Sequence, residues 1–192
     1  MLTDQFLDEI IPIYDPSLRA VISKNAVIET VAPKTILSNM GEREMQVRFL
    51  ISGVIWGYMY NSAGEEITIC FVKDPGEVIY GSEYLGAEAS EITLEAITEC
   101  EIFSMPMELL LELQTEYPEI AGLYLDIMIK RLQYHWATKK MLYLKTARER
   151  YEWFLQEYPG IIDKVNHRRV ASFLNMTPVT LSRIRTGKEK YL

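Results

Sequence analysis

The chain has 192 residues, of which 48% are apolar and 24% charged, a composition typical of a globular protein with one or two domains. Its two cysteines, Cys70 and Cys100, exclude a disulfide framework and a four-thiolate cluster, and they suit buried positions in a reducing compartment. No stretch approaches the roughly 18 consecutive apolar residues of a membrane-spanning helix, and the acidic, amphipathic start lacks the pattern of a secretory signal. We therefore expect a cytoplasmic protein with no membrane partner.

The net charge of −7 is distributed unevenly along the chain. From Lys164 to the end, seven Lys and Arg face one acid, Glu189, so this segment carries +6. Residues 1–163 hold thirteen Lys and Arg and twenty-six acids, which gives −13. A basic segment on an acidic body confines attraction for phosphate to one end, which is typical of a regulator and not of a protein that coats DNA.

Two helical segments and a series of short β-rich runs are predicted in the first 105 residues. Residues 3–25 have helical periodicity that is interrupted once, at Asp15-Pro16. Seven β-rich runs follow, separated by turns rich in Gly, Pro and Asn, at 27–31, 45–51, 54–60, 66–72, 78–80, 92–96 and 100–104. Strands at this regular spacing predict an antiparallel sandwich or barrel.

A short helix from Met107 to Gln114 and a long one from Pro118 to about Leu142 are predicted next. The long helix has two apolar stripes, and a helix that is apolar on two sides must be buried on both. We expect one side to cover its own β domain and the other to pack on the same helix of a second copy. The residues assigned to this dimer helix are Ile120, Leu123, Ile127, Tyr134 and Met141, and the second stripe consists of Leu125, Met128, Leu132 and Trp136.

The C-terminal segment is predicted to be helical throughout. A helix from Lys145 to Tyr158 has one apolar face and ends at a Pro-Gly pair. Two short helices then lie within 166–185. Only residues 159–165 precede this pair and only 186–192 follow it, so there is no room for a β-hairpin wing beside it.

The two short helices have the features of a helix-turn-helix. Val170, Leu174 and Leu181 belong to a shared apolar face, and Asn175 tolerates the left-handed conformation needed between the helices. Thr177 can cap the second helix, and the proline that follows it suits a first helical position. Such a pair presents its second helix to the DNA major groove.

The outward positions of this motif carry short polar groups and cations suited to DNA. The residues expected to contact base edges are Val179, Ser182 and Arg183, because an arginine fork matches the paired acceptors of a guanine. The residues expected to contact phosphates are His167, Arg168, Arg169, Thr177, Thr180, Arg185 and Lys188.

An enzyme is not expected, because no glycine-rich phosphate loop, metal-ligand spacing or nucleophile with a neighbouring base is present. The alternative to a DNA-binding regulator is a non-catalytic ligand-sensing or protein-interaction module whose helix-turn-helix no longer contacts DNA. A module that binds only protein would have no reason to concentrate cations in its last thirty residues.

Over essentially its whole length the chain resembles the Crp/Fnr family of bacterial transcription regulators. The most specific matches are Val170-Ala-Ser-Phe-Leu174 and Thr177-Pro-Val-Thr-Leu-Ser-Arg-Ile-Arg185. Weaker matches are Asn39-Met-Gly41, Ile51-Ser-Gly-Val-Ile55, Gly64-Glu-Glu-Ile-Thr68, Phe71, Leu94-Glu-Ala96, Tyr117-Pro-Glu119 and Ala147-Arg-Glu-Arg-Tyr151.

The resemblance implies an α+β fold with three parts. They are a cyclic-nucleotide-binding-like antiparallel β-roll of the double-stranded β-helix or jelly-roll type with flanking helices (1–116), a long dimerisation helix (117–143) and an all-α helix-turn-helix module without a full wing (144–192). It also implies a homodimer on a palindromic operator near promoters, with RNA polymerase as a candidate partner.

The sequence departs from the family where cyclic nucleotides are bound. The family holds the cyclic phosphate with a Gly-Glu pair and an Arg-Ser pair, but here the Arg-Ser place falls at Ser90-Glu91, and no arginine lies between Lys73 and Lys130. The segment instead holds acids, among them Glu77, Glu83, Glu88, Glu91 and Glu95. The candidate effector pocket consists of Gly81, Ser82, Glu83, Ser90 and Glu91. Because carboxylates repel a cyclic phosphate, we expect no binding of cAMP.

No cofactor or metal is expected either. Family members that sense oxygen or gases use an iron–sulfur cluster, which needs four cysteines, or haem. The two histidines, His135 and His167, fall on the long helix and on the DNA module, so neither suits an axial haem ligand in the roll. The effector is therefore unknown: an apolar ligand, a protein, or none.

A second departure lies at the start of the recognition helix. Well-known members present an arginine and a glutamate there, whereas this chain has Pro178 and Val179. Arg183 remains at the later position from which the family contacts a guanine. Since valine can touch a thymine methyl but accepts no hydrogen bond, the preferred operator should differ from theirs.

Overall fold

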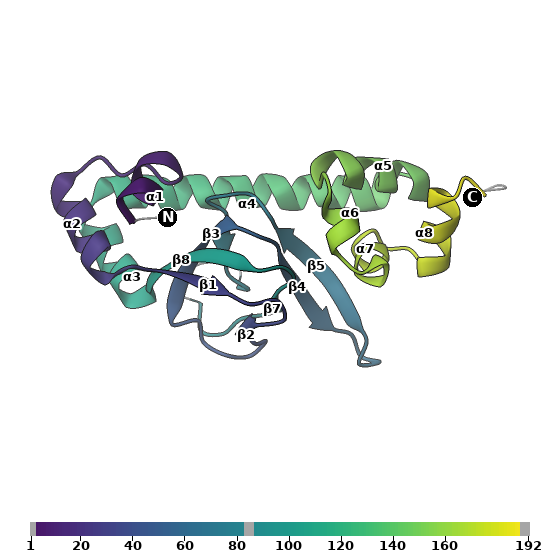
Figure 1. The fold of residues 1–192 in the computed structure, drawn as a ribbon, viewed down its shortest axis with the longest axis horizontal. Coiled ribbons are helices and arrows are strands. Elements are labelled where there is room, and N and C mark those ends of the chain that lie inside the picture. Colours follow the sequence, from purple (N-terminus) through teal and green to yellow (C-terminus); the bar gives the residue numbers. More distant parts are fainter. Residues whose placement is uncertain (1–2, 83–86, 189–192) are drawn as a thin grey trace.

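The computed structural model describes residues 3–82 and 87–188, with a β-roll at their centre. Its strands are β1 (Val27–Val31), β2 (Ile36–Ser38), β3 (Gln46–Ser52), β4 (Ile55–Tyr60), β5 (Glu66–Val72), β6 (Val78–Ile79), β7 (Thr93–Ala96) and β8 (Cys100–Pro106). They form two four-stranded antiparallel sheets, ordered β1-β8-β3-β6 and β2-β7-β4-β5 (Figure 1). We call the second one the docking sheet.

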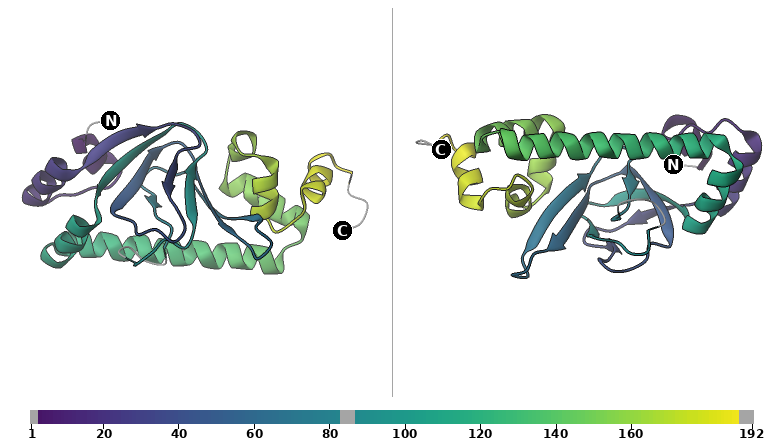
Figure 2. Two further views of the ribbon diagram at one scale, coloured as in Figure 1. Left: turned by 90° about the horizontal axis from the view of Figure 1, so that it is seen from below. Right: turned by 180° about the vertical axis from the view of Figure 1, so that it is seen from behind.

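Helices lie at both ends of the roll and along one side of it. They are α1 (Thr3–Glu9), α2 (Pro16–Asn25), α3 (Met107–Glu116), α4 (Pro118–Leu144), α5 (Ala147–Glu157), α6 (Ile161–Lys164), α7 (His167–Phe173) and α8 (Pro178–Arg185). Helix α4 runs beside the roll from α1–α3 at one end to α5–α8 at the other, as both views in Figure 2 show. None of the described helices is long and apolar enough to cross a membrane.

The predicted α+β class is confirmed. Each of the seven β-rich runs contains a strand, and the helices expected around 107–114, 118–142 and 145–158 are present with ends shifted by a few residues. Strand β2 was not predicted, because its three residues are too short to give an alternating pattern. The segment before the helix-turn-helix forms α6 and no strand, while residues 189–192 of the predicted wingless end lie outside the described part.

The interior of the roll is formed by aliphatic side chains from both sheets. Leu50, Ile55, Ile79, Leu94 and Ile102 are all at most 1% exposed and belong to one cluster. Gly53 makes the tight connection from β3 to β4 possible, since its φ is 107° and an added Cβ would lie 2.6 Å from the Glu99 carbonyl oxygen. Because these aliphatic side chains point into the roll, the side chains that alternate with them lie on the outer faces of the two sheets, where the helices pack.

Helices α1–α3 and the start of α4 cover the outer face of the sheet that contains β3 and β8. Phe6 stacks on Phe103 with ring centroids 4.2 Å apart, and both are buried. The Glu119 carboxylate, in the first turn of α4, accepts hydrogen bonds from the backbone N–H groups of Tyr14 and Asp15 at 2.7 and 3.3 Å. These contacts tie the N-terminal helices to the long helix.

The outer face of the docking sheet packs against the C-terminal helices. Trp56, Tyr58 and Phe71 join one buried cluster with Phe154, Tyr158, Phe173 and Leu181. The Phe71 ring lies 6.1, 6.0 and 5.5 Å from the rings of Phe154, Tyr158 and Phe173, respectively. The helix-turn-helix is therefore anchored to the roll through an aromatic interface.

The structure corrects the assignment of the dimer contacts on α4. Ile120 and Met141 are 3% and 1% exposed within a single chain, and Leu123, Ile127 and Tyr134 pack on the chain's own clusters. This stripe faces inward because the roll and the C-terminal helices lie on the same side of α4. The stripe left exposed consists of Leu125, Ile129, Leu132 and Trp136, with Ile129 in place of the expected Met128.

Candidate nucleic-acid interface

The helix-turn-helix is built from two capped helices joined by a left-handed residue. The Asn166 side chain accepts a hydrogen bond from the Arg168 N–H at 2.9 Å and starts α7. Asn175 has a φ of 48° in the turn, as its side chain predicted. The Thr177 hydroxyl oxygen accepts from the Thr180 N–H at 3.0 Å and starts α8.

The buried face of the motif fixes the angle between the two helices. Val170, Ala171 and Phe173 on α7, and Leu181 and Ile184 on α8, are all buried. The remaining positions of α8 must therefore face outward. This is the amphipathic division expected of a helix that packs with one side and contacts a partner with the other.

The outward face of α8 carries the three residues predicted to contact bases. Val179 is 60% exposed, and Ser182 and Arg183 are exposed on the same helix. Arg185 lies at the end of α8, where its guanidinium Nη1 is 3.0 Å from His167 Nδ1 at the start of α7. This contact brings two of the predicted phosphate-binding residues together.

The other residues predicted to bind phosphate divide into two groups. Arg168 and Lys188 are exposed, and the Thr177 and Thr180 hydroxyl groups lie 2.9 Å apart at the start of α8. Arg169 is different, because its side chain points to the roll. Its guanidinium lies 3.5 Å from the centroid of the Trp56 ring and 3.3 Å from Glu95 Oε1. The spacing of residues in the sequence could not show that Arg169 faces the roll while Arg168 faces solvent.

The candidate effector pocket is partly filled by a carboxylate from outside the predicted segment. Glu44 is 7% exposed, and its carboxylate accepts hydrogen bonds from the Gly81 N–H at 2.9 Å and the Ser82 hydroxyl at 3.3 Å. The Ser90 hydroxyl donates to the Ile92 carbonyl at 2.7 Å, and Glu91 is exposed. Glu83 lies outside the described residues.

Two arginines reach this region from distant parts of the sequence. Arg131 of α4 donates to the Ser82 carbonyl oxygen at 2.9 Å and lies over the Tyr80 ring, 4.0 Å from its centroid. Burial lowers the pKa of Arg48 on β3, an effect that the nearby Glu44 carboxylate opposes. Arg48 and Arg131 both lie outside the segment between Lys73 and Lys130, so inspection of that segment alone could not find them.

A cavity of about 870 Å³ lies between the roll and α4. Its walls include the apolar side chains of Ile10, Val78 and Ile127, and α4 contributes charges of both signs, Asp126 and Arg131 among them. A cavity of this size suits a small molecule. Sequence analysis missed it, because its walls come from four separate segments.

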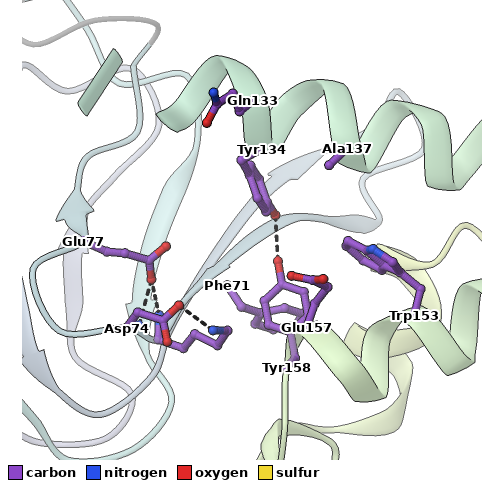
Figure 3. A pocket seen from close by; sticks show the side chains of 10 residues that line it. Phe71, Asp74, Glu77, Gln133, Tyr134, Ala137, Trp153, Glu157 and Tyr158 are labelled. Atoms are coloured by element: carbon purple, nitrogen blue, oxygen red, sulfur yellow. Dashed lines mark hydrogen bonds and ion pairs between the residues drawn. The ribbon is translucent and has the colours of Figure 1, made fainter. Parts of the chain in front are cut away.

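A second cavity, of about 310 Å³, lies where the roll, α4 and α5 meet, and shares Phe71 and Tyr134 with the larger one (Figure 3). The Tyr158 hydroxyl donates to the Tyr134 hydroxyl at 3.0 Å across this junction. Burial raises the pKa of both phenols, so both stay protonated. The Glu77 carboxylate accepts from the N–H groups of Lys73 and Asp74 at the rim.

The described residues contain no group of three or more His, Cys, Asp or Glu side chains that could hold a metal. Burial raises the pKa of the Cys70 thiol to about 11, so it is protonated at neutral pH. Cys100 is buried, and burial raises its pKa as well. His135 is exposed on α4, where partial desolvation and the charge of Arg131 lower its pKa.

Replacing Glu44 should destabilise the fold. Glu44→Ala leaves the Gly81 N–H and the Ser82 hydroxyl buried without their acceptor, so we expect the free energy of unfolding to fall by about 1–3 kcal/mol. The control is Glu42→Ala, which removes an exposed carboxylate from the same loop. Urea denaturation of both variants measures the difference, and an equal loss in the two would show that the Glu44 contacts contribute nothing.

No family model matches the chain. Among curated proteins, the patatin-like phospholipase domain-containing protein 7 of Mus musculus is 24% identical over 118 residues, which are 62% of this chain and 8% of that protein. The chain thus matches only a small part of that relative.

Solved structures match over most of the chain. FixK2 from Bradyrhizobium japonicum has a TM-score of 0.73 and 20% identity, with 84% of this chain and 83% of that one covered. A protein from Eubacterium rectale assigned to the Crp/Fnr family of transcriptional regulators has a TM-score of 0.68 and 19% identity, with 91% and 84% covered. The chain therefore has the Crp/Fnr-like cyclic nucleotide-binding fold together with the element order of those regulators.

Proposed function

We propose that the chain is a sequence-specific DNA-binding transcriptional regulator that acts as a homodimer on a palindromic operator. The observation that carries this proposal is the outward face of α8, which presents Val179, Ser182 and Arg183 beside the exposed cations Arg168 and Arg185. Such a face combines groups for base edges with groups for phosphate, as DNA-binding helices do. The likeness in fold to Crp/Fnr regulators supports it.

In this proposal the chain has three functional parts and no catalytic site. Residues 1–116 receive a signal, 117–143 join two copies, and 144–192 bind DNA. The protein acts in the cytoplasm, where chromosomal DNA is accessible, and RNA polymerase is a candidate partner at promoters. The effector occupies the cavity between the roll and α4.

The exposed stripe of α4 is proposed to pack on the same helix of a second copy. Leu125, Ile129, Leu132 and Trp136 are between 44% and 61% exposed and recur at spacings of four, three and four residues. That is the spacing at which two helices pair side by side. A palindromic operator also requires two copies of the helix-turn-helix related by a two-fold axis.

A charge in the middle of this stripe should separate the two copies. Light scattering at micromolar concentration should give about twice the 22.3 kDa of one chain for the wild type, and the mass of a single chain for Leu132→Glu. Leu155→Glu, at a 39% exposed position of α5, is the matched control and should stay dimeric. A monomeric wild type, or a dimeric Leu132→Glu, would contradict this interface.

Arg183 should provide selectivity between DNA sequences. Arg183→Ala should cost about 1–3 kcal/mol on DNA selected by the wild-type protein and relax the preference at one base pair. Arg168→Ala removes an exposed charge from α7, so it should weaken selected and scrambled DNA alike and reduce the salt slope by about one unit. Competition titrations at two salt concentrations test both variants, and an equal loss on both DNAs for Arg183→Ala would make it a phosphate contact.

We further propose that the roll does not bind cAMP at physiological concentrations. Donor groups that could hold a cyclic phosphate here are already engaged: the Gly81 N–H and the Ser82 hydroxyl donate to the Glu44 carboxylate, and Arg131 donates to the Ser82 carbonyl oxygen. A second anion at this place would meet that buried negative charge. Calorimetric titration of the wild-type protein with cAMP and cGMP should give no binding heat, and a micromolar dissociation constant for either would contradict the proposal.

A further inference from the structure

Two side chains of α7, those of Arg169 and Ser172, make polar contacts with the docking sheet. Arg169 lies against Trp56 and Glu95, as described above, and the Ser172 hydroxyl accepts a hydrogen bond from the Thr68 N–H at 3.0 Å. The two α7 residues are three apart, so they lie on the same side of the helix. Together these contacts cover one small area on β4, β5 and β7.

The Arg169 contact is more than a loose surface ion pair. The side chains of Arg169 and Glu95 are 26% and 14% exposed, and Trp56 beneath the guanidinium is fully buried. The Trp56 indole N–H donates to the Thr68 hydroxyl at 2.9 Å, so the ring is held in place. An arginine between an aromatic face and a carboxylate has its charge satisfied on both sides.

The contacts that hold this guanidinium compete with a DNA phosphate for it. Its Nη2 faces Glu95, its ring-stacked face is covered by Trp56, and a phosphate brought to this place would be repelled by the Glu95 carboxylate. Its neighbour Arg168 is exposed, so α7 points one cation to solvent and the other to the roll. The docked position of the helix-turn-helix thus withholds one of the cations expected to meet the DNA backbone.

We propose that this contact is an autoinhibitory latch: the roll holds Arg169 in the DNA-free protein and releases it to a phosphate when the module binds DNA. Glu95 lies on β7, three residues after Ile92, which lines the cavity between the roll and α4, so the strand that begins beside this cavity also carries the latch. The inference rests on the proposed function, because it states how the DNA-binding surface is regulated.

The first arm of the test uses no DNA. Hydrogen exchange of the β5 segment that contains Thr68 is followed in the wild-type protein and in Glu95→Gln, which keeps the shape of the side chain and removes its charge. Glu99→Gln removes an exposed carboxylate from the same roll and is the control. Exchange at this segment should be faster in Glu95→Gln only, and equal exchange in all three proteins would show that no latch exists.

The second arm measures affinity for DNA selected by the wild-type protein. Glu95→Gln should bind about fivefold more tightly, because a larger fraction of the protein is then free to bind. Glu99→Gln controls for the general loss of negative charge. In an Arg169→Ala background the effect of Glu95→Gln should vanish, since no guanidinium remains to be released.

The outcomes separate the latch from the proposed function. Faster exchange in Glu95→Gln with tighter binding that depends on Arg169 supports the latch. A wild-type protein that binds DNA while Glu95→Gln and Glu99→Gln behave alike overturns the latch and leaves the proposed function standing. If neither the wild type nor any variant binds DNA, the proposed function is overturned. The latch is then overturned as well, because Arg169 has no DNA phosphate to be released to, whatever the exchange arm shows about its contact with Glu95.

Discussion

The outer face of the docking sheet is the constraint on which the arrangement of the chain depends. Trp56, Tyr58 and Phe71 make that face too apolar to remain in water, and the C-terminal helices cover it with Phe154 and Phe173. Each buried aromatic side chain of this size contributes roughly 1.5–3 kcal/mol relative to exposure. One interface therefore supplies the core of the C-terminal helices and also joins them to the roll.

In the proposed regulator, this shared core would connect the state of the roll to DNA binding. The cavity between the roll and α4 ends at Tyr134, whose hydroxyl is hydrogen-bonded to that of Tyr158 in the C-terminal cluster. A ligand that moves α4 would have to repack both phenols, because neither can lose its partner in a buried place without cost. The roll and the helix-turn-helix are thus connected through side chains that contact one another.

A second feature of the structure is that buried or half-buried carboxylates of the chain engage its own hydrogen-bond donors and cations. Glu44 occupies the donors of Gly81 and Ser82, and Glu95 pairs with Arg169. In the proposed regulator, the first carboxylate would disfavour a cyclic phosphate beside Gly81 and Ser82. The second would compete with a DNA phosphate for Arg169.

Local sequence patterns predicted the helices and strands well. They did not predict which side chains would meet, because that depends on packing between segments far apart in the sequence. The strand runs, the Thr177 cap and the left-handed Asn175 follow from a few neighbouring residues, so the sequence was sufficient for them. Which stripe of α4 faces inward depends on where the roll lies, and both stripes have helical spacing. The approach of Arg131 to Ser82 across 49 residues of chain leaves no local signal either.

The most direct test of the account is the selection of genomic DNA fragments by the wild-type protein, followed by sequencing and footprinting of the bound fragments. A homodimer with two helix-turn-helix motifs should enrich a two-fold symmetric motif whose half-sites lie about one helical turn apart, ~34 Å from centre to centre. Binding without an enriched motif, or a single half-site without symmetry, would contradict the account.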